Sequence, residues 1–265
     1  MRTVPNRRNA ERPTVLAVFA HPDDESLACG GTLARLAAEN VRVVLLCASH
    51  GERGGEFGPV RNDALGGSRA SEVFDAAEVL GISDLLLLDH PDGDLRWSHV
   101  AEFHADIVAA IERYRPVALI TFGDDGLYWH LDHVGVYERT TTAVRSLGSE
   151  GPALYYVTMP RGVMRAIVNA GRARGWTPPV KGLWSLVPDA FGLEASAPSM
   201  IVDVRDWIGA KLAAIRHHRS QMGAGPLDLI TEAEARQWLG AEQFHCDEGV
   251  LPLFDLINTN RGTGP

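Results

Sequence analysis

Two short stretches of this chain hold residues whose types and spacing could do chemistry. The first is HPDDE at residues 21–25, which directly follows the apolar run 14–19. The second is HLDH at residues 130–133, which comes soon after the apolar run 117–122. Imidazoles and carboxylates are the side chains that bind zinc and move protons at hydrolytic sites. The two stretches together therefore predict a metal centre.

The first stretch allows its members to divide the work. His21 and Asp24 are separated by a tight turn, so both could reach one metal ion. Asp23 lies between them and cannot easily share that coordination geometry, so it could instead take a proton from an attacking water molecule. Zinc hydrolases commonly use three protein ligands and leave a fourth position open. Two histidines and one carboxylate can also hold Fe²⁺, so Zn²⁺ is expected and Fe²⁺ is the alternative.

The second stretch offers two histidines for different tasks. His130 and His133 are three residues apart, so on a helical turn they share a face. One could bind the metal while the other meets the developing oxyanion or the leaving amine. Asp132 is a candidate for fixing a histidine tautomer. Each motif alone could be a strand-end turn with an aspartate helix cap, but two motifs at corresponding strand ends argue for a site.

The elements that must position these motifs follow a simple alternation. Apolar runs at 15–20, 41–47, 85–88 and 117–122 alternate with helical patterns at 25–40, 68–80 and 100–113. This alternation predicts an α/β fold with a mainly parallel sheet and right-handed crossovers. Open sheets of this kind keep their sites at the carboxyl ends of the strands, where both motifs lie. The pair Gly30-Gly31 is interpreted as close helix packing, since GxGxxG is missing.

Composition narrows the classes of partner. The net charge is −9 and Lys and Arg form no dense run, so nucleic acid and anionic membranes are not expected as partners. No apolar run is long enough to cross a membrane, and residues 1–12 lack the apolar core of a signal peptide. The odd count of three cysteines predicts free thiols and a cytoplasmic location. Cys29 and Cys47 lie in apolar surroundings and are expected in the core.

The two motifs resemble those of the LmbE-like, or PIG-L, family of zinc-dependent de-N-acetylases, which includes deacetylases of the mycothiol and bacillithiol pathways. Three other patterns are similar to the family's in order and spacing: RxxE at 69–72, DGxL at 92–95 and KxxAxxxHxSQ at 211–221. The resemblance runs from residue 14 to about residue 222.

The resemblance implies a role for each matching residue. The zinc ligands would be His21, Asp24 and His133, and Asp23 would be the general base. His130 would stabilise the oxyanion or protonate the leaving amine, with Asp132 tuning it.

The resemblance also implies neighbouring roles. Tyr128 stands where the mycothiol-pathway enzyme has a mobile tyrosine that assists the oxyanion. Arg69 and Asp92 would contact substrate hydroxyls, and Glu52 would be a further cleft residue that binds substrate.

The family's fold implies a Rossmann-like three-layer domain with a smaller C-terminal part over the cleft. The expected parts are a flexible segment at 1–12, a metal-binding catalytic core at 13–159, an irregular flap or subdomain at 160–199, and a strand–helix part at 200–265 that completes the single domain. The segment 160–199 is assigned separately because it holds five prolines and is long for a simple connection.

The expected reaction is hydrolysis of an N-acetyl group on a small amino-sugar metabolite. An amidase that cuts mycothiol S-conjugates is one alternative, because the loop ERGG at 52–55 resembles that group somewhat. A natural-product deacetylase is another. A non-catalytic sugar-binding descendant would normally have lost the base or a ligand, and all are present here. Assembly into a homo-oligomer is left open.

Overall fold

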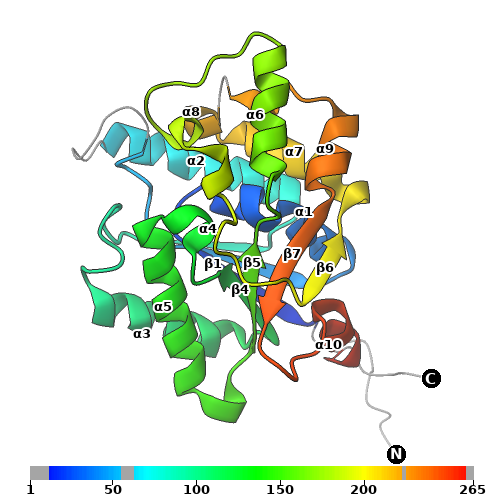
Figure 1. Ribbon diagram of the computed structural model, residues 1–265. Helices are drawn as coiled ribbons and strands as arrows, with labels where there is room; N and C mark the ends of the chain where they lie inside the picture. Colours follow the sequence, from blue (N-terminus) through cyan, green and yellow to red (C-terminus); the bar gives the residue numbers. More distant parts are fainter. Residues whose placement is uncertain (1–11, 55–62, 223–224, 261–265) are drawn as a thin grey trace, which may run out of the picture.

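The computed structural model describes residues 12–54, 63–222 and 225–260, and these residues form one seven-stranded sheet with helices on both faces (Figure 1). The strands are β1 (Thr14–Phe19), β2 (Arg42–Cys47), β3 (Asp84–Leu87), β4 (Ala118–Phe122), β5 (Ala153–Thr158), β6 (Met200–Asp203) and β7 (Ala241–Cys246).

The strand order across the sheet is β3-β2-β1-β4-β5-β7-β6. Strands β1 to β5 are mutually parallel, whereas β7 runs antiparallel to both β5 and β6. The order 3-2-1-4-5 is that of a doubly wound α/β fold, so the predicted fold class is confirmed. From β1 the chain moves outward through β2 and β3 and then returns to β4 on the other side. Such a switch point leaves a crevice beyond the carboxyl ends of β1 and β4.

The central strands are buried because their sequences are almost continuously apolar. Every residue of β1 and β4 is buried, as expected for parallel strands covered on both faces. Phe19 and Phe122 end these two strands and contact each other edge to face, with ring centroids 5.0 Å apart. This aromatic pair forms the floor beneath the two motifs.

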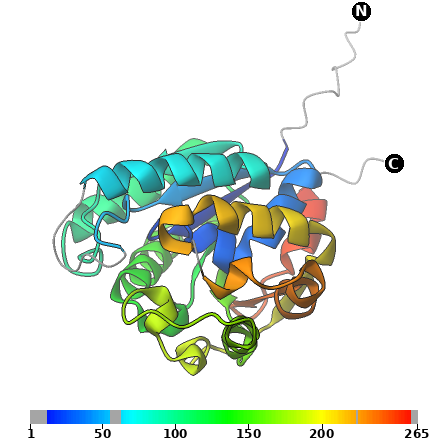
Figure 2. The ribbon, with the colours of Figure 1, turned by 90° about the horizontal axis from the view of Figure 1, so that it is seen from above.

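The helices make the outer layers. They are α1 (Asp24–Ala38), α2 (Asp63–Leu80), α3 (Val100–Tyr114), α4 (Gly126–Trp129), α5 (Leu131–Ser146), α6 (Val163–Ala173), α7 (Ile208–His217), α8 (Arg219–Met222), α9 (Glu232–Leu239) and α10 (Leu253–Asn260). Helices α1, α2 and α7 pack together, while α3 and α5 form a second group against the sheet. Figure 2 shows α2 and α7 side by side. Among the described residues, no helix is long and apolar enough to span a membrane.

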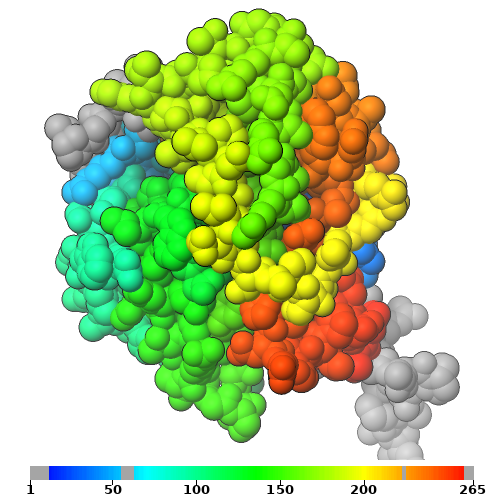
Figure 3. All heavy atoms as spheres, viewed as in Figure 1, coloured from blue at the N-terminus to red at the C-terminus, as the bar shows by residue number. Residues whose placement is uncertain are grey.

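The segment 160–199 is only partly irregular. Its first part is the helix α6, whose buried side chains Met164, Ile167 and Val168 share one face. The rest holds two short 3₁₀ turns, Leu183–Ser185 and Pro188–Ala190. Figure 3 shows this segment, in yellow-green to yellow, lying across the surface between α5 and α9. Strands β6 and β7 then join the main sheet, so the C-terminal part extends the same layer.

Helix α1 is interrupted at Cys29, whose backbone is not helical. The next helical residues are Gly30 and Gly31, and a Cβ on Gly31 would lie 2.6 Å from the Cβ of Val204. Gly31 therefore permits close packing against the connection between β6 and α7, whereas a Cβ on Gly30 would make only ordinary contacts, at 3.6 Å. Cys29 and Cys47 are free and buried, as predicted.

Candidate metal centre and catalytic cleft

A cleft of about 640 Å³ opens at the carboxyl ends of β1 and β4. Most of the predicted site residues line it: His21, Asp23, Asp24, Arg69, Asp92, Tyr128, His130 and Asp132. His133 lies directly behind the lining and is 1% exposed. The sheet topology therefore brings together two motifs that are about a hundred residues apart in the sequence.

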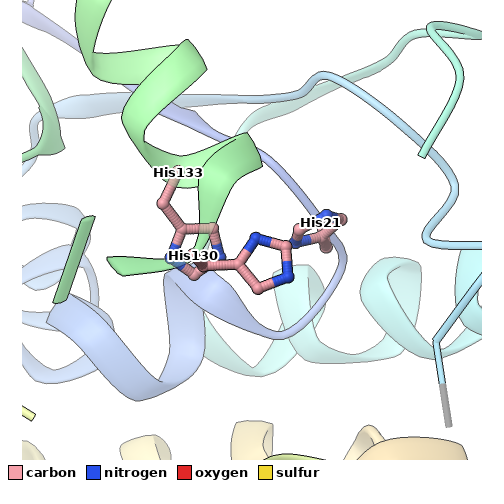
Figure 4. Close-up of side chains that lie close together, drawn as sticks. All are labelled: His21, His130 and His133. Carbon is pink, nitrogen blue, oxygen red and sulfur yellow. The ribbon is translucent and has the colours of Figure 1, made fainter. Parts of the chain in front are cut away.

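Three histidine rings meet at the base of this cleft. Figure 4 shows His21 coming from the turn after β1 and His133 from α5, with His130 beside them. The ring centroids are 5.0 Å apart for His21 and His130, and 4.6 Å apart for His130 and His133. One nitrogen of each ring lies within 4.8 Å of the others, and His21, Asp92 and Asp132 form a second such group. Both groups have the donor atoms that could hold a metal ion.

The proton of His21 is fixed by two carboxylates. Its Nε2 lies 3.0 Å from Asp92 Oδ1 and 3.1 Å from Asp132 Oδ2. Because both neighbours are acceptors, a proton belongs on Nε2, and Nδ1 faces Asp24, whose Oδ2 is 3.4 Å away. Burial lowers the pKa of His21, but the charge of Asp92 and the hydrogen bonds to the carboxylates raise it well above 6.5. A carboxylate on the far nitrogen is the usual support for a metal-binding histidine.

His133 is prepared in the same way by a backbone carbonyl. Its Nδ1 lies 3.1 Å from Gly126 O, which places the ring proton on Nδ1. The ring stacks on Phe122 with centroids 4.0 Å apart. Its Nε2 is buried, and among the described residues it has no hydrogen-bond partner, although Asp24 Oδ1 is 3.1 Å away. A buried lone pair facing a carboxylate is the arrangement that an intervening cation would satisfy.

Asp24 lies between these two nitrogens. One oxygen accepts a hydrogen bond from the backbone N–H of His21 at 2.8 Å. Burial raises the pKa of Asp24, but the opposing effect of His133 and His21 is larger, so the pKa lies well below 3.8. His21 Nδ1, the Asp24 carboxylate and His133 Nε2 thus form a set of two nitrogens and one ionised oxygen, which fits a divalent transition metal.

Asp23 is positioned as a base beside this set. Its backbone φ of 119° turns the side chain away from the direction taken by Asp24. Its Oδ2 lies 3.2 Å from Arg69 Nη2. Burial raises the pKa of Asp23 to about 6, against the opposing charge of Arg69. The carboxylate is therefore ionised at neutral pH and is still basic enough to accept a proton.

Arg69 ties the loops around Asp23 together. Its guanidinium donates to Gly51 O at 2.8 Å and to Pro22 O at 2.7 Å. A Cβ on Gly51 or Gly54 would come within 2.4 Å and 2.3 Å of this group, so glycine is required at both positions. Much of the hydrogen-bonding capacity of Arg69 is thus used within the protein, and its predicted contact with a substrate hydroxyl stays a prediction.

Asp92 lies at the cleft surface, and Glu52 lies behind it in the protein interior. Asp92 lines the cleft and accepts a hydrogen bond from the backbone N–H of Arg53 at 2.6 Å. Burial raises the pKa of Asp92, but His21 and this hydrogen bond bring it below 3.8. Glu52 is 4% exposed and is outside the lining, and its carboxylate accepts from the backbone N–H of Asp92 at 3.3 Å. Glu52 therefore supports the turn that carries Asp92.

The second motif begins in an unusual turn. Asp125 Oδ1 accepts from the backbone N–H of Leu127 at 3.0 Å, and both Leu127 and Trp129 have positive φ, 65° and 63°. This backbone brings the ring of Tyr128 to within 5.8 Å of His130. Burial raises the pKa of Tyr128 well above 10, so its hydroxyl keeps its proton.

His130 caps the N-terminus of α5. Its Nδ1 accepts a hydrogen bond from the backbone N–H of Asp132 at 3.3 Å, which places the ring proton on Nε2. Burial and the charges of His133 and His21 lower the pKa of His130 to about 3. His130 is therefore a neutral donor that lines the cleft. The side chain of Asp132 was expected to serve His130, but its carboxylate bonds His21, Gly93 N at 2.6 Å and Leu95 N at 3.0 Å.

A buried ion pair braces the first motif, and sequence reasoning found only half of it. Glu25 Oε1 lies 2.8 Å from His218 Nε2 and accepts from Ser26 Oγ at 2.5 Å, while Oε2 accepts from the backbone N–H of Asp23 at 3.0 Å. Both Glu25 and His218 are fully buried. His218 is the histidine of the pattern at 211–221, but its partner could not be read from the sequence.

A second buried pair at the break in α1 was missed. Lys211 Nζ lies 2.5 Å from Glu242 Oε1 and donates to Leu27 O at 2.9 Å. Glu242 accepts from the backbone N–H groups of Gly31 and Thr32 at 2.9 Å and 2.7 Å. This carboxylate caps the helix that restarts after Cys29. Only the fold, which sets β7 beside α1, could reveal it.

Several known proteins are similar to this chain in sequence. The profile of the PIG-L family, described as GlcNAc-PI de-N-acetylase, matches residues 16–144. A 1D-myo-inositol 2-acetamido-2-deoxy-alpha-D-glucopyranoside deacetylase from Thermobispora bispora is 31% identical over 274 residues, covering 89% of this chain and 88% of the relative. A protein of the same description, numbered 2, from Catenulispora acidiphila is 30% identical over 277 residues and covers 89% of each.

Solved structures agree on the fold. A conserved protein from Thermus thermophilus matches with a TM-score of 0.61 at 26% identity, covering 90% of this chain and 96% of that one. An N,N'-diacetylchitobiose deacetylase from Pyrococcus horikoshii matches with a TM-score of 0.62 at 20% identity, covering 93% and 89%. With identity and coverage at this level along nearly the whole chain, and both motifs gathered in one cleft, the chain belongs to the PIG-L family of de-N-acetylases.

Proposed function

We propose that this protein is a zinc-dependent hydrolase that removes the N-acetyl group from a small amino-sugar metabolite, giving acetate and a free amine. The observation that carries the proposal is that His21 Nδ1 and His133 Nε2 both face the buried Asp24 carboxylate, with Asp23 beside it. Relatives named as deacetylases of amino-sugar compounds support the same reaction.

The three proposed ligands fit a catalytic zinc site, because two imidazoles and one carboxylate leave room for a water molecule. A bound zinc ion would lower the pKa of that water and polarise the amide carbonyl. Fe²⁺ fits the same donors and is the alternative metal.

The remaining groups would manage protons and charge. Asp23 would accept a proton from the attacking water and pass it to the leaving nitrogen, since its pKa of about 6 suits both transfers. His130 would donate from Nε2 to the oxygen that becomes negative, and the Tyr128 hydroxyl would donate to the same oxygen. Oxyanion stabilisation suits a neutral His130 better than acid catalysis does, because its pKa is near 3. Arg69 and Asp92 would contact sugar hydroxyls at the polar wall.

One observation favours a second candidate within the same reaction type. The cleft also has an apolar wall, which we define by the lining residues Leu127, Trp129, Leu131, Leu183, Leu186 and Met222. These apolar side chains share the cleft lining with Arg69 and Asp92, and they could hold an apolar group attached to the amino sugar. A natural-product deacetylase, or an amidase for S-conjugates, would need that contact.

The test is amine release from a panel of compounds by metal-loaded and chelated protein. The panel contains free N-acetylglucosamine, its inositol conjugate and an aryl glycoside. We expect chelator-sensitive release from at least one compound, and preference for the aryl glycoside would favour the second candidate. If the metal-loaded protein released amine from none of the compounds, the proposal would be contradicted.

The accompanying variant is Asp23→Asn. We expect it to bind metal normally and to lose about 10²–10⁴-fold in kcat, because the proton acceptor is gone. The matched control is Asp89→Asn, since the Asp89 side chain is 90% exposed and pairs with His50. A sugar-binding protein would instead show unchanged ligand affinity in Asp23→Asn and no turnover in either protein.

A small amino-sugar metabolite is the proposed partner. A cytoplasmic location and assembly into a homo-oligomer remain predictions of the sequence.

A further inference from the structure

The turn that carries Tyr128 has a strained backbone, which needs support from neighbouring groups. Leu127 has φ 65° and ψ −40°, and Trp129 has φ 63°. Non-glycine residues in such conformations are strained and persist only where the surroundings over-determine them. Inside the turn, Asp125 accepts two hydrogen bonds, one at its side chain from Leu127 N–H at 3.0 Å and one at its carbonyl from Trp129 N–H at 2.7 Å.

The remaining support comes from a distant segment. The backbone N–H of Gly192 donates to Leu127 O at 2.9 Å. The neighbouring Phe191 is 3% exposed, and its ring centroid lies 4.6 Å from that of Tyr128. Residues 191–192 thus contact both the strained backbone, at Leu127, and the ring of Tyr128.

This segment is itself fixed to the sheet. Gly192 has φ 68°, and a Cβ there would lie 2.1 Å from Met159 O, so only glycine fits. Arg161 donates from Nε to Gly192 O at 3.3 Å and also bonds the carbonyl of Leu193. Met159 directly follows β5, so the contact reaches back to the end of a central strand.

We propose that Phe191 and Gly192 are positioning residues, which lock the strained turn and hold the Tyr128 hydroxyl toward the reacting carbonyl. This inference rests on the proposed function, because it assigns the way in which one oxyanion donor is kept in place. Residues 191–192, within the segment 160–199 that was expected to be a flap or subdomain, act in this proposal as a fixed brace. Loss of the Phe191 ring would free Tyr128 to rotate, while the polar wall and the metal ligands stay in place.

The test is a double-mutant cycle between Phe191→Ala and Tyr128→Phe, with kcat and KM measured for each protein. We expect Tyr128→Phe to lower kcat by about 10²-fold, as for removal of one oxyanion donor, and Phe191→Ala to lower it by at least tenfold with KM nearly unchanged. In the Tyr128→Phe background, Phe191→Ala should lower kcat hardly further. Phe191→Leu, which keeps an apolar side chain, should restore most of the rate.

The control variant is Phe103→Ala. Phe103 is also buried, at 1% exposure, but it lies on α3 and its ring contacts His90. It should lower stability without lowering kcat per folded molecule. Equal losses from Phe191→Ala in both Tyr128 backgrounds, or an effect on KM alone, would overturn the inference and leave the proposed function standing.

A readout without substrate separates the two proposals. With fluorotyrosine incorporated, the ¹⁹F resonance of Tyr128 is assigned by its loss in Tyr128→Phe. Phe191→Ala should shift or broaden this resonance and leave the other tyrosines unchanged. An unchanged Tyr128 resonance would refute the brace, whatever the enzyme hydrolyses. A shifted resonance in a protein that hydrolyses none of the compounds would support the brace and refute the function.

Discussion

The two turns that form the site are held by different forces. The turn after β1 carries His21, Asp23 and Asp24, and charged side chains hold it from every side. The turn after β4 carries Tyr128 and His130, and it is held by one aspartate, by a backbone hydrogen bond from Gly192 and by the aromatic ring of Phe191. Both turns contain non-glycine residues with positive φ. The first is buried, whereas Trp129 in the second is 55% exposed.

The difference matches the tasks that we assign to the turns. Metal ligands and a base must keep their charges and distances before substrate arrives, and buried ion pairs with shared hydrogen bonds fix both. Oxyanion donors act on a group that the substrate brings, so a turn at the cleft surface can carry them. We therefore expect changes to the residues that brace the first turn to cost stability, and changes to the residues that brace the second turn to cost rate.

The largest effect is expected from His218→Ala. Removal of this imidazole leaves the buried Glu25 carboxylate without its counter-charge, which typically costs about 3–5 kcal/mol. Chemical denaturation of both proteins measures the difference. The matched control is His217→Ala, because the side chain of His217 is 31% exposed and lies 3.8 Å from Asp75. A similar loss from both variants would mean that the pair does not brace the first turn.

The cost of His218→Ala should depend on pH. The pKa of His218 is raised above 6.5 in the folded protein, so its contribution is full below 6.5 and is lost as pH rises through the folded pKa. The pKa of Glu25 is lowered below 4.5, so its contribution is present above 4.5 and is lost as pH falls through the folded pKa. The difference in unfolding free energy should therefore be largest between pH 4.5 and 6.5.

A smaller effect is expected from Arg69→Met, seen as a shift in the pH profile. The charge of Arg69 lowers the pKa of Asp23, so its removal should move the acid limb of kcat/KM upward from about pH 6. The profile of Arg53→Met is the control, because Arg53 also lines the cleft but pairs with Asp94. A limb that stays in place in Arg69→Met would show that Asp23 is not the group that titrates.

The smallest effect is expected from Trp129→Asn. Asparagine tolerates positive φ better than tryptophan, and the exposed indole contributes little burial, so unfolding free energy should change by no more than about 1 kcal/mol. Thermal unfolding measures this. A loss of several kcal/mol would show that the indole, rather than Phe191, holds the second turn. If the apolar wall binds substrate, KM for an aryl glycoside should rise.

Much of the fold could be predicted from the sequence because its signals are local. Buried parallel strands need continuous apolar runs, and the runs at 14–19 and 117–122 correspond to β1 and β4. The strand–helix alternation then fixed the fold class. Helix α6 was hidden by the prolines around it, and α10 was not predicted, because both depend on faces that only packing covers.

The site divides in the same way. The sequence by itself determined which residues have the chemistry, since His21, Asp23, Asp24 and His133 stand in motifs set directly after strands. Tertiary structure decided how each ring is protonated, because Asp92 reaches His21 and Gly126 O reaches His133 only once the chain is folded.

Tertiary structure also supplied partners that no motif marks: Glu25 for His218, Glu242 for Lys211 and Phe191 for Tyr128. The physical reason is the distance along the sequence over which each effect is determined. Side-chain type and spacing act within a few residues, whereas desolvation, proton placement and backbone strain are set by whatever groups the fold packs against them.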